Sequence, residues 1–162
     1  MTHVAATRRS PDEQALLETA LRDLFEHKVT FNQTLGMTMV SLAPPAPSAR
    51  IQMRPDLIGH YLYGRLHGGV ISAVLDAMGG VAVMVGITEK YCDEAAEVVM
   101  HRFSRLGTID LRVDYLRPGI GEHFIASAEV VRLGGRVAST QMRLVNQDGT
   151  LIATGAAAYI VS

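Results

Sequence analysis

The spacing of hydrophobic positions changes along the chain, and each pattern predicts a different kind of element. In residues 11–28, apolar side chains recur at helical spacing on one face, at Leu17, Leu21, Leu24 and Phe25. A serine precedes the segment, a proline takes its first position and acids fill its first turn, which are signals for the start of a helix. We therefore expect an amphipathic helix at the surface.

From Gly107 onward, hydrophobic positions alternate with polar ones, which is typical of strands with one buried face. In TIDLRVDY, the alternation puts Ile109 on the apolar face and Thr108 on the polar face. The turns PGIG, GG and NQDG then separate three more apolar segments, so successive strands should be antiparallel neighbours. Residues 35–55 predict two further strands broken by prolines.

Residues 64–87 are almost entirely apolar after His67, yet they contain one carboxylate, Asp76. The segment reaches the ~20 residues that a membrane span needs. Against a span, it carries five glycines after His67, and a charge at the middle of a bilayer costs on the order of 3 kcal/mol or more. A central helix buried by its own protein is the better interpretation.

These elements together predict an α+β fold, in which an antiparallel sheet of about six strands wraps a long central helix. An extra helix lies at the N-terminus. The length fits one domain over residues 11–162, and we expect the polar residues 1–10 to be a disordered lead. One face of the sheet would lack cover, and pairing with a second copy is the economical solution.

Composition narrows the classes of function. Hydrophobic residues make up 48% of the chain, so a sizeable core can form, and the net charge is only −1. Because no block of like charge occurs, there is no electrostatic basis for binding nucleic acid. The single cysteine, Cys92, excludes an internal disulfide, offers no metal-binding spacing and suits a reducing compartment. The polar N-terminus lacks the apolar core of a signal peptide, so we expect a cytoplasmic protein.

Two motifs carry a resemblance to a known family. A helix opened by His67-Gly68-Gly69 has an acid nine residues after the histidine, and the strand from Thr108 fits (S/T)-x-D-x-x-x-x-Y-x-x-P. Together with the closing segment GRVASTQMRLVNQDGTLIATGAAAYIV, this resembles the hotdog-fold acyl-CoA thioesterases of the phenylacetate-pathway (PaaI-like) type, over residues 34–161. The resemblance implies a hotdog fold that hydrolyses an acyl-CoA thioester to a carboxylic acid and free coenzyme A. Coenzyme A would be part of the substrate, with no separate cofactor and no metal.

The start of the apolar helix suits the chemistry of a thioester. Attack on the carbonyl places negative charge on its oxygen, and fixed N–H donors aimed there are worth on the order of 10²–10³ in rate. The first turn of a helix has unsatisfied N–H groups and a favourable dipole, and glycine lets a ligand approach closely. Gly68 and Gly69 therefore suit an oxyanion hole, and the alternative is that they form only a tight turn into the helix.

Asp76 would then serve as a base or a nucleophile. The nine residues from His67 to Asp76 rise roughly 13 Å along a helix and rotate by roughly 180°, so Gly68 and Asp76 of one chain cannot easily meet at one carbonyl. Two copies with antiparallel central helices would bring them together, and the resemblance implies the same shared site. We expect a homodimer, or a dimer of dimers. The alternative is that Asp76 is a structural acid, hydrogen-bonded at the interface.

Further candidates come from the family pattern. The resemblance implies that the Thr108 hydroxyl orients the attacking water and that His67 orders the oxyanion loop; a routine strand threonine and a structural histidine are the alternatives. His60 stands in the loop where many relatives carry an asparagine that binds the thioester oxygen. A neutral imidazole can donate one hydrogen bond, so His60 could substitute for it or point to solvent.

Basic groups are expected near the phosphates of coenzyme A, and Arg132 and Arg136 flank the Gly134–Gly135 turn. For any single arginine, a solvated surface role is the more common one. Met78 and Met84 on the central helix would suit an adaptable acyl pocket or the plain core.

Two functions from different classes remain, and a third lacks its motif. The first is an acyl-CoA thioesterase, which Asp76 and Thr108 together favour. The second is a non-catalytic hotdog domain that binds acyl-CoA. A hotdog hydratase or dehydratase would need its own Asp-His motif, and no such motif is visible in the sequence.

Overall fold

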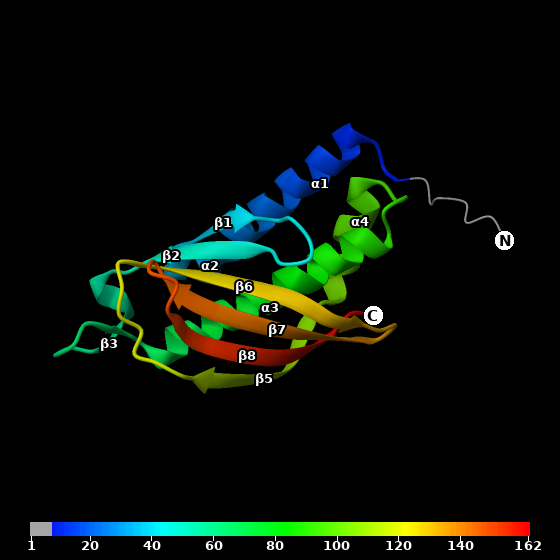
Figure 1. The fold of residues 1–162 in the computed structure, drawn as a ribbon. Helices are drawn as coiled ribbons and strands as arrows, with labels where there is room; N and C mark the ends of the chain where they lie inside the picture. The colour runs from blue at the N-terminus through cyan, green and yellow to red at the C-terminus, as the bar shows by residue number, and fades with distance from the viewer. Residues whose placement is uncertain (1–7) are drawn as a thin grey trace.

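The structure is a computed structural model that describes residues 8–162. Its main sheet has six antiparallel strands in the order β1-β2-β6-β7-β8-β5. These strands are β1 (Met37–Ser41), β2 (Ser48–Gln52), β5 (Gly107–Tyr115), β6 (His123–Leu133), β7 (Val137–Asn146) and β8 (Leu151–Ile160). A second, two-stranded sheet pairs β3 (Ile58–His60) with β4 (Arg65–Leu66) and projects from one end of the molecule (Figure 1). The predicted α+β class and strand number are confirmed.

The long helix α3 (Gly68–Lys90) lies across the inner face of the sheet. It packs mainly against β6, β7 and β8, and its side chains Val74, Leu75 and Met78 are fully buried. Among the described residues it is the one helix long and apolar enough to cross a membrane, yet 56% of its most apolar window is buried inside the fold. This burial is what the central helix of a folded domain requires.

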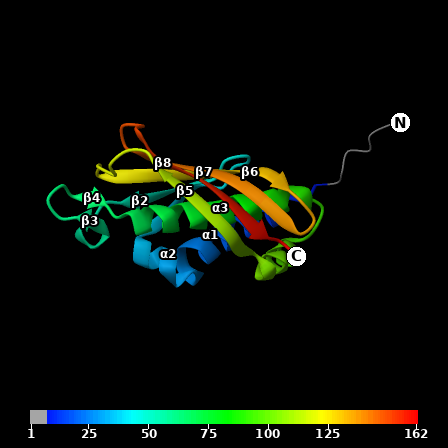
Figure 2. The same cartoon turned by 90° about the horizontal axis from the view of Figure 1, so that it is seen from below.

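A helical segment at the N-terminus covers the side of α3 that faces away from the sheet (Figure 2). It consists of α1 (Pro11–Asp23), the π-helical turn η1 (Leu24–Lys28) and α2 (Thr30–Leu35). The Ser10 hydroxyl accepts a hydrogen bond from the Glu13 N–H and so caps α1. The predicted amphipathic helix is confirmed, and it extends beyond α1 as a cover for α3 made of three helical pieces.

The segment between α3 and β5 is partly helical, and the chain ahead of α1 packs beside it. It contains α4 (Ala96–Arg102) and the short turn η3 (Phe103–Arg105); the remaining short element, η2 (Pro55–Leu57), precedes β3. Residues 1–7 of the expected lead lie outside the described residues. Arg8 forms an ion pair with Glu89 at 2.7 Å, and the Arg9 guanidinium donates to the carbonyl of Tyr91 at 2.9 Å.

The outer face of the sheet is polar. Glu129, Gln141, Ala156 and Arg112 are cross-strand partners in one row over β6, β7, β8 and β5, and all four are exposed. Antiparallel sheets commonly leave one such face in water. The expectation that this face needs a second copy to cover it therefore has no support in its side chains, and any argument for a dimer must rest elsewhere.

Strand β5 departs from the simple alternation expected of it. A β-bulge lies between Thr108 and Asp110, which pair with the consecutive residues Tyr159 and Ala158 of β8. The extra residue, Ile109, is 56% exposed. Because the bulge shifts the alternation by one position, Thr108 joins Leu111 on the side facing α3. The prediction that Ile109 occupies the apolar face is wrong for this reason.

Candidate functional site

Asp76 lies in the middle of α3, half-buried, with hydrogen bonds from two strands of the sheet. The Thr108 hydroxyl on β5 donates to Oδ1 of Asp76 at 2.8 Å. The Tyr159 hydroxyl on β8 donates to the backbone carbonyl of Asp76 at 2.8 Å and approaches Oδ1 at 3.2 Å. Within the described part of the chain, no donor is bonded to Oδ2. One carboxylate oxygen is thus held in place while the other remains available for chemistry.

Tyr159 is the member of this group that the sequence analysis missed. It is 2% exposed, and burial raises the pKa of its phenol, as does the negative charge of Asp76. The phenol therefore stays protonated and acts only as a donor to Asp76. The alternation of the last strand places Tyr159 on the inward face, and this could have indicated its role, since a buried tyrosine hydroxyl usually finds a hydrogen-bond partner.

Two adjacent glycines in α3 relate differently to this tyrosine. A Cβ at Gly79 would lie 2.2 Å from the Tyr159 hydroxyl oxygen and 2.9 Å from the ring carbon that bears it. A Cβ at Gly80 would meet nothing nearer than 4.0 Å. Only Gly79 is therefore needed for the tyrosine to approach the helix backbone.

Gly79→Ala should lower the free energy of unfolding by about 1–3 kcal/mol through overpacking, less the ~0.5–1 kcal/mol that alanine gains in a helix. Gly80→Ala should instead raise the free energy of unfolding by about 0.5–1 kcal/mol, because alanine favours the helix and meets no steric clash at this position. Urea denaturation of both variants and of the unchanged protein measures the difference. Equal stabilities for the two variants would contradict the close approach of Tyr159 at Gly79.

The start of α3 leaves one N–H group free. The Nδ1 atom of His67, the N-cap residue, accepts a hydrogen bond from the Gly69 N–H at 2.8 Å. The N–H groups of Val70 and Ile71 bond to the carbonyl of His67. Among the described residues, nothing accepts from the Gly68 N–H, and Gly68 is only half-buried. Of the two glycines predicted for an oxyanion hole, Gly68 is the one whose N–H is unbonded, and His67 holds this turn.

Strand β5 contacts α3 at both candidate positions. Thr108, at its start, bonds to Asp76, and the hydroxyl of Tyr115, at its end, donates to the carbonyl of Gly68 at 3.1 Å. Gly68 and Asp76 lie eight positions apart, which corresponds to roughly 12 Å of rise and roughly 80° of rotation. The two groups are thus separated along the helix axis rather than by the half-turn expected from the sequence.

Beside Asp76, a cavity of about 290 Å³ lies between α3 and the N-terminal helical segment. Its polar lining residues are Asp76, Thr108, Tyr159 and Asn32, and most of the rest is apolar. The apolar lining comes from α1, η1 and α2, from β1 and the residue after it, and from α3, where it includes Met84 but not the fully buried Met78. The carboxylate of Asp76 therefore borders a mostly apolar cavity.

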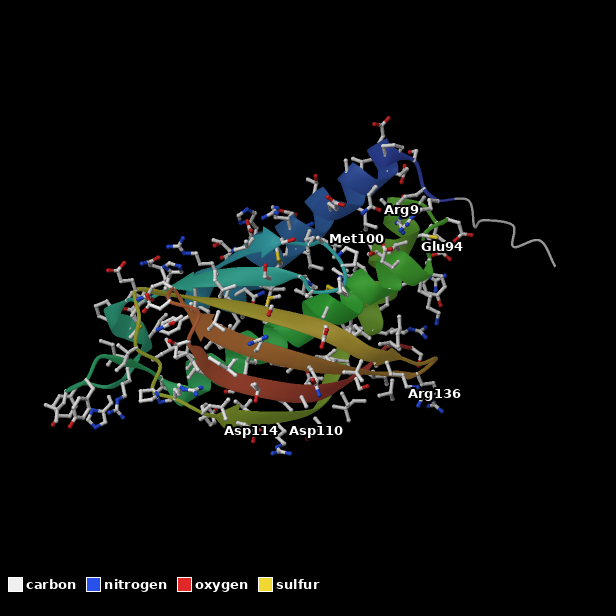
Figure 3. The ribbon with its side chains drawn as sticks, viewed as in Figure 1. Arg9, Glu94, Met100, Asp110, Asp114 and Arg136 are labelled. Carbon is white, nitrogen blue, oxygen red and sulfur yellow. The ribbon has the colours of Figure 1, made fainter. Side chains whose placement is uncertain are left out.

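Three other candidates lie away from this group. His60 is exposed in the β3–β4 hairpin, where its ring stacks with that of Tyr61 at a centroid distance of 5.8 Å. Arg132 and Arg136 are exposed near the β6–β7 turn, and Figure 3 shows Arg136 at the end of the sheet. None of the three lines the cavity at Asp76. Within residues 8–162, no group of three His, Cys, Asp or Glu side chains could hold a metal ion.

Comparisons with known proteins bear on the family of the chain. The model of the thioesterase superfamily matches residues 63–153. The medium/long-chain acyl-CoA thioesterase YigI of Escherichia coli K12 is 35% identical over 149 residues, which cover 92% of this chain and 95% of that protein. Similar relatives with the same name occur in Shigella flexneri and Salmonella typhimurium, at 35% and 34% identity over the same shares of both chains.

Known structures show the same fold. A crystal structure of a Shewanella oneidensis protein related to the thioesterase superfamily is 37% identical, has a TM-score of 0.87 and covers 95% of this chain and 100% of that one. Thioesterase superfamily member 2 of the mouse has a TM-score of 0.69 at 20% identity, with the same coverage, and so indicates the fold alone.

Proposed function

The chain belongs to the thioesterase superfamily, and on this premise we propose that it hydrolyses acyl-CoA thioesters of medium or long chain, with Asp76 as the base or nucleophile. The observation that carries the proposal is the position of the Asp76 carboxylate. It is held by Thr108 and Tyr159 at the wall of an apolar cavity, where a thioester carbonyl would lie if its acyl chain entered the cavity.

Asp76 could promote hydrolysis of the thioester by either of two routes. As a base, Asp76 takes a proton from water, and the oxygen of that water forms a bond to the thioester carbon. Collapse of the tetrahedral intermediate breaks the carbon–sulfur bond, and the departing thiolate takes up the proton. As a nucleophile, the carboxylate would attack the carbon itself and break the carbon–sulfur bond, which releases the coenzyme A thiolate and leaves a mixed anhydride. Water then hydrolyses the anhydride to the free acid and the regenerated Asp76 carboxylate, and the thiolate takes up the proton that water loses. In the first route, Thr108 supplies a hydroxyl oxygen that can accept a hydrogen bond from the water.

The oxyanion donor in this proposal is the Gly68 N–H of a second chain. Roughly 12 Å of helix rise separates Gly68 from Asp76 in one chain, so a single carbonyl cannot reach both. A two-fold axis at Arg112 would pair β5 with its copy, and, with Ile109 left unpaired as the bulge residue, it would set Thr108 of one chain opposite Tyr115 of the other. Because these residues bond to Asp76 and Gly68 respectively, the pairing would bring each acid toward the other chain's donor.

The edge of the sheet supports this homodimer. In the described structure β5 is an edge strand, and it carries exposed apolar side chains at Ile109 and Tyr115, followed by the exposed Leu116. The bulge and the charged Asp110 and Arg112 lie on the same edge, but an edge strand with unpaired backbone groups can still pair with the same strand of another chain. A dimer of dimers would need a further contact, and the polar outer face of the sheet gives no particular reason for one.

The identity of the acyl group distinguishes two subtypes. The phenylacetate-pathway type, suggested by the HGG and TID motifs, would prefer an aromatic acyl group. The apolar cavity, together with the medium/long-chain activity named for the E. coli relative, favours an aliphatic chain.

A panel of purified substrates tests the proposed function. Saturated acyl-CoAs of increasing length and phenylacetyl-CoA are incubated with the protein, and a free-thiol reagent measures released coenzyme A. We expect steady turnover with the highest kcat/KM for a medium or long aliphatic chain. Acyl-CoA binding in calorimetry without any release of thiol would instead support the non-catalytic binding domain.

A further inference from the structure

The cavity at Asp76 has an open side and a closed side. Val29, Phe31 and Thr108 line it and are exposed, so it opens between α2 and β5. Leu21 and Phe25 line it and are buried, which marks its depth beneath the N-terminal helical segment. An acyl chain entering past Asp76 would therefore run inward along α3.

The volume of the cavity sets a limit on that chain. An apolar cavity of roughly 150 Å³ holds benzene, so the cavity of about 290 Å³ accommodates roughly a dozen carbon atoms. A medium-length aliphatic chain would fill it completely.

A thin wall closes the inner side of the cavity. Leu21 and Leu42 line it and also line a neighbouring hollow that lies over Val85, Thr88 and Glu89 of α3. That second hollow also has Gln14 and Glu18 on its walls, so it is more polar than the first. These two leucines separate an apolar chamber from a polar one.

We propose that the cavity is the acyl-chain chamber and that Leu42 is the residue that limits chain length. Methylene groups up to the leucine wall are buried among apolar side chains, whereas further ones would meet the wall and then the polar hollow. Leu42 lies just after β1 and is only half-buried, so its truncation disturbs the core less than truncation of the buried Leu21. This inference rests on the proposed function and adds a determinant of its substrate.

The test compares kcat/KM across saturated acyl-CoAs for the unchanged protein and for Leu42→Ala. For the unchanged protein, kcat/KM should rise by up to roughly fourfold for each added methylene and level off when the chain reaches roughly a dozen carbons. Leu42→Ala removes part of the wall, so its profile should level off roughly two to four carbons later. Leu133→Ala is the matched control, since Leu133 is also half-buried against the core but does not line the cavity.

A binding measurement makes the inference independent of turnover. Calorimetric titration of Asp76→Asn and of Asp76→Asn/Leu42→Ala with fatty acids of increasing length should show the same shift toward longer chains. Identical length profiles with and without Leu42, in an active enzyme, would overturn the chamber wall and leave the proposed function intact. Absence of thiol release from every acyl-CoA would overturn the function, while the fatty-acid titration would still decide the wall.

Discussion

Asp76→Asn should lower acyl-CoA turnover by roughly 10²–10⁴-fold, which is the usual worth of a positioned base, while the protein stays folded and binds substrate. The asparagine side chain keeps an oxygen that can accept the hydrogen bonds from Thr108 and Tyr159. Its amide has no basicity with which to activate water and no charge with which to attack carbon. The change thus removes the chemistry and retains the contacts.

Steady-state release of thiol measures this loss, and calorimetry with an unreacted acyl-CoA measures retained binding. Asp12→Asn is the matched control, because Asp12 is exposed in the first turn of α1, far along the chain from the site. Hydrolysis at the normal rate by Asp76→Asn would contradict the catalytic assignment and leave Asp76 with a structural role.

Gly68→Pro should lower turnover by roughly 10²–10³-fold, because it removes the N–H proposed to stabilise the oxyanion. Gly68 is the first residue of α3, a position where proline is well tolerated. The preceding His67 has φ −66° and ψ 138°, which is the extended conformation that a residue before proline prefers. A Cβ at Gly68 comes no nearer than 3.4 Å to the Tyr115 ring, so the variant should fold.

Gly68→Ala separates the donor from the added bulk, since alanine introduces the same Cβ and keeps the N–H. The ratio of turnover between the alanine and proline variants measures the contribution of the donor. A ratio near one, with circular dichroism showing both variants folded, would move the oxyanion hole to another part of the chain.

Mixing the two inactive variants tests the shared site directly. In a heterodimer of Asp76→Asn and Gly68→Pro chains, one site has both substitutions and the other has neither. Subunit exchange should therefore restore up to half of the unchanged activity per heterodimer. If heterodimers form, as shown by native mass spectrometry of differently tagged chains, and the mixture stays inactive, the site lies within one chain.

The sequence predicted the helices and strands well because each of them leaves a strong local signal. The helical spacing before Phe25, the apolar run around Asp76 and the alternation after Gly107 each reflect burial of one face by neighbouring elements. Thr108 and Tyr115 belong to the strand motif that carries the resemblance, and in the structure both donate hydrogen bonds to residues of α3.

The features that the sequence did not reveal depend on register and on tertiary packing. The contact of Tyr159 with Asp76 joins positions 83 residues apart, and nothing local to either residue signals it. The cavity arises from the packing of the N-terminal helical segment against α3. Its length along α3 depends on the position of Leu42, which lines its inner wall. The sequence suggested that the outer face of the sheet needs cover, because without the cross-strand register the polar residues of different strands cannot be placed together on that face.

The bulge at Ile109 makes β5 one residue longer than its pairing with β8 requires. With Ile109 removed, Asp110 would follow Thr108 directly, and regular pleating would keep Thr108 opposite Tyr159 and facing Asp76. With Ile109 kept and the bulge smoothed out, the same pleating would instead turn Thr108 to the polar outer face, and the acid would lose its threonine partner. A single-codon deletion at position 109 of the gene should thus leave the acid and its threonine partner in contact.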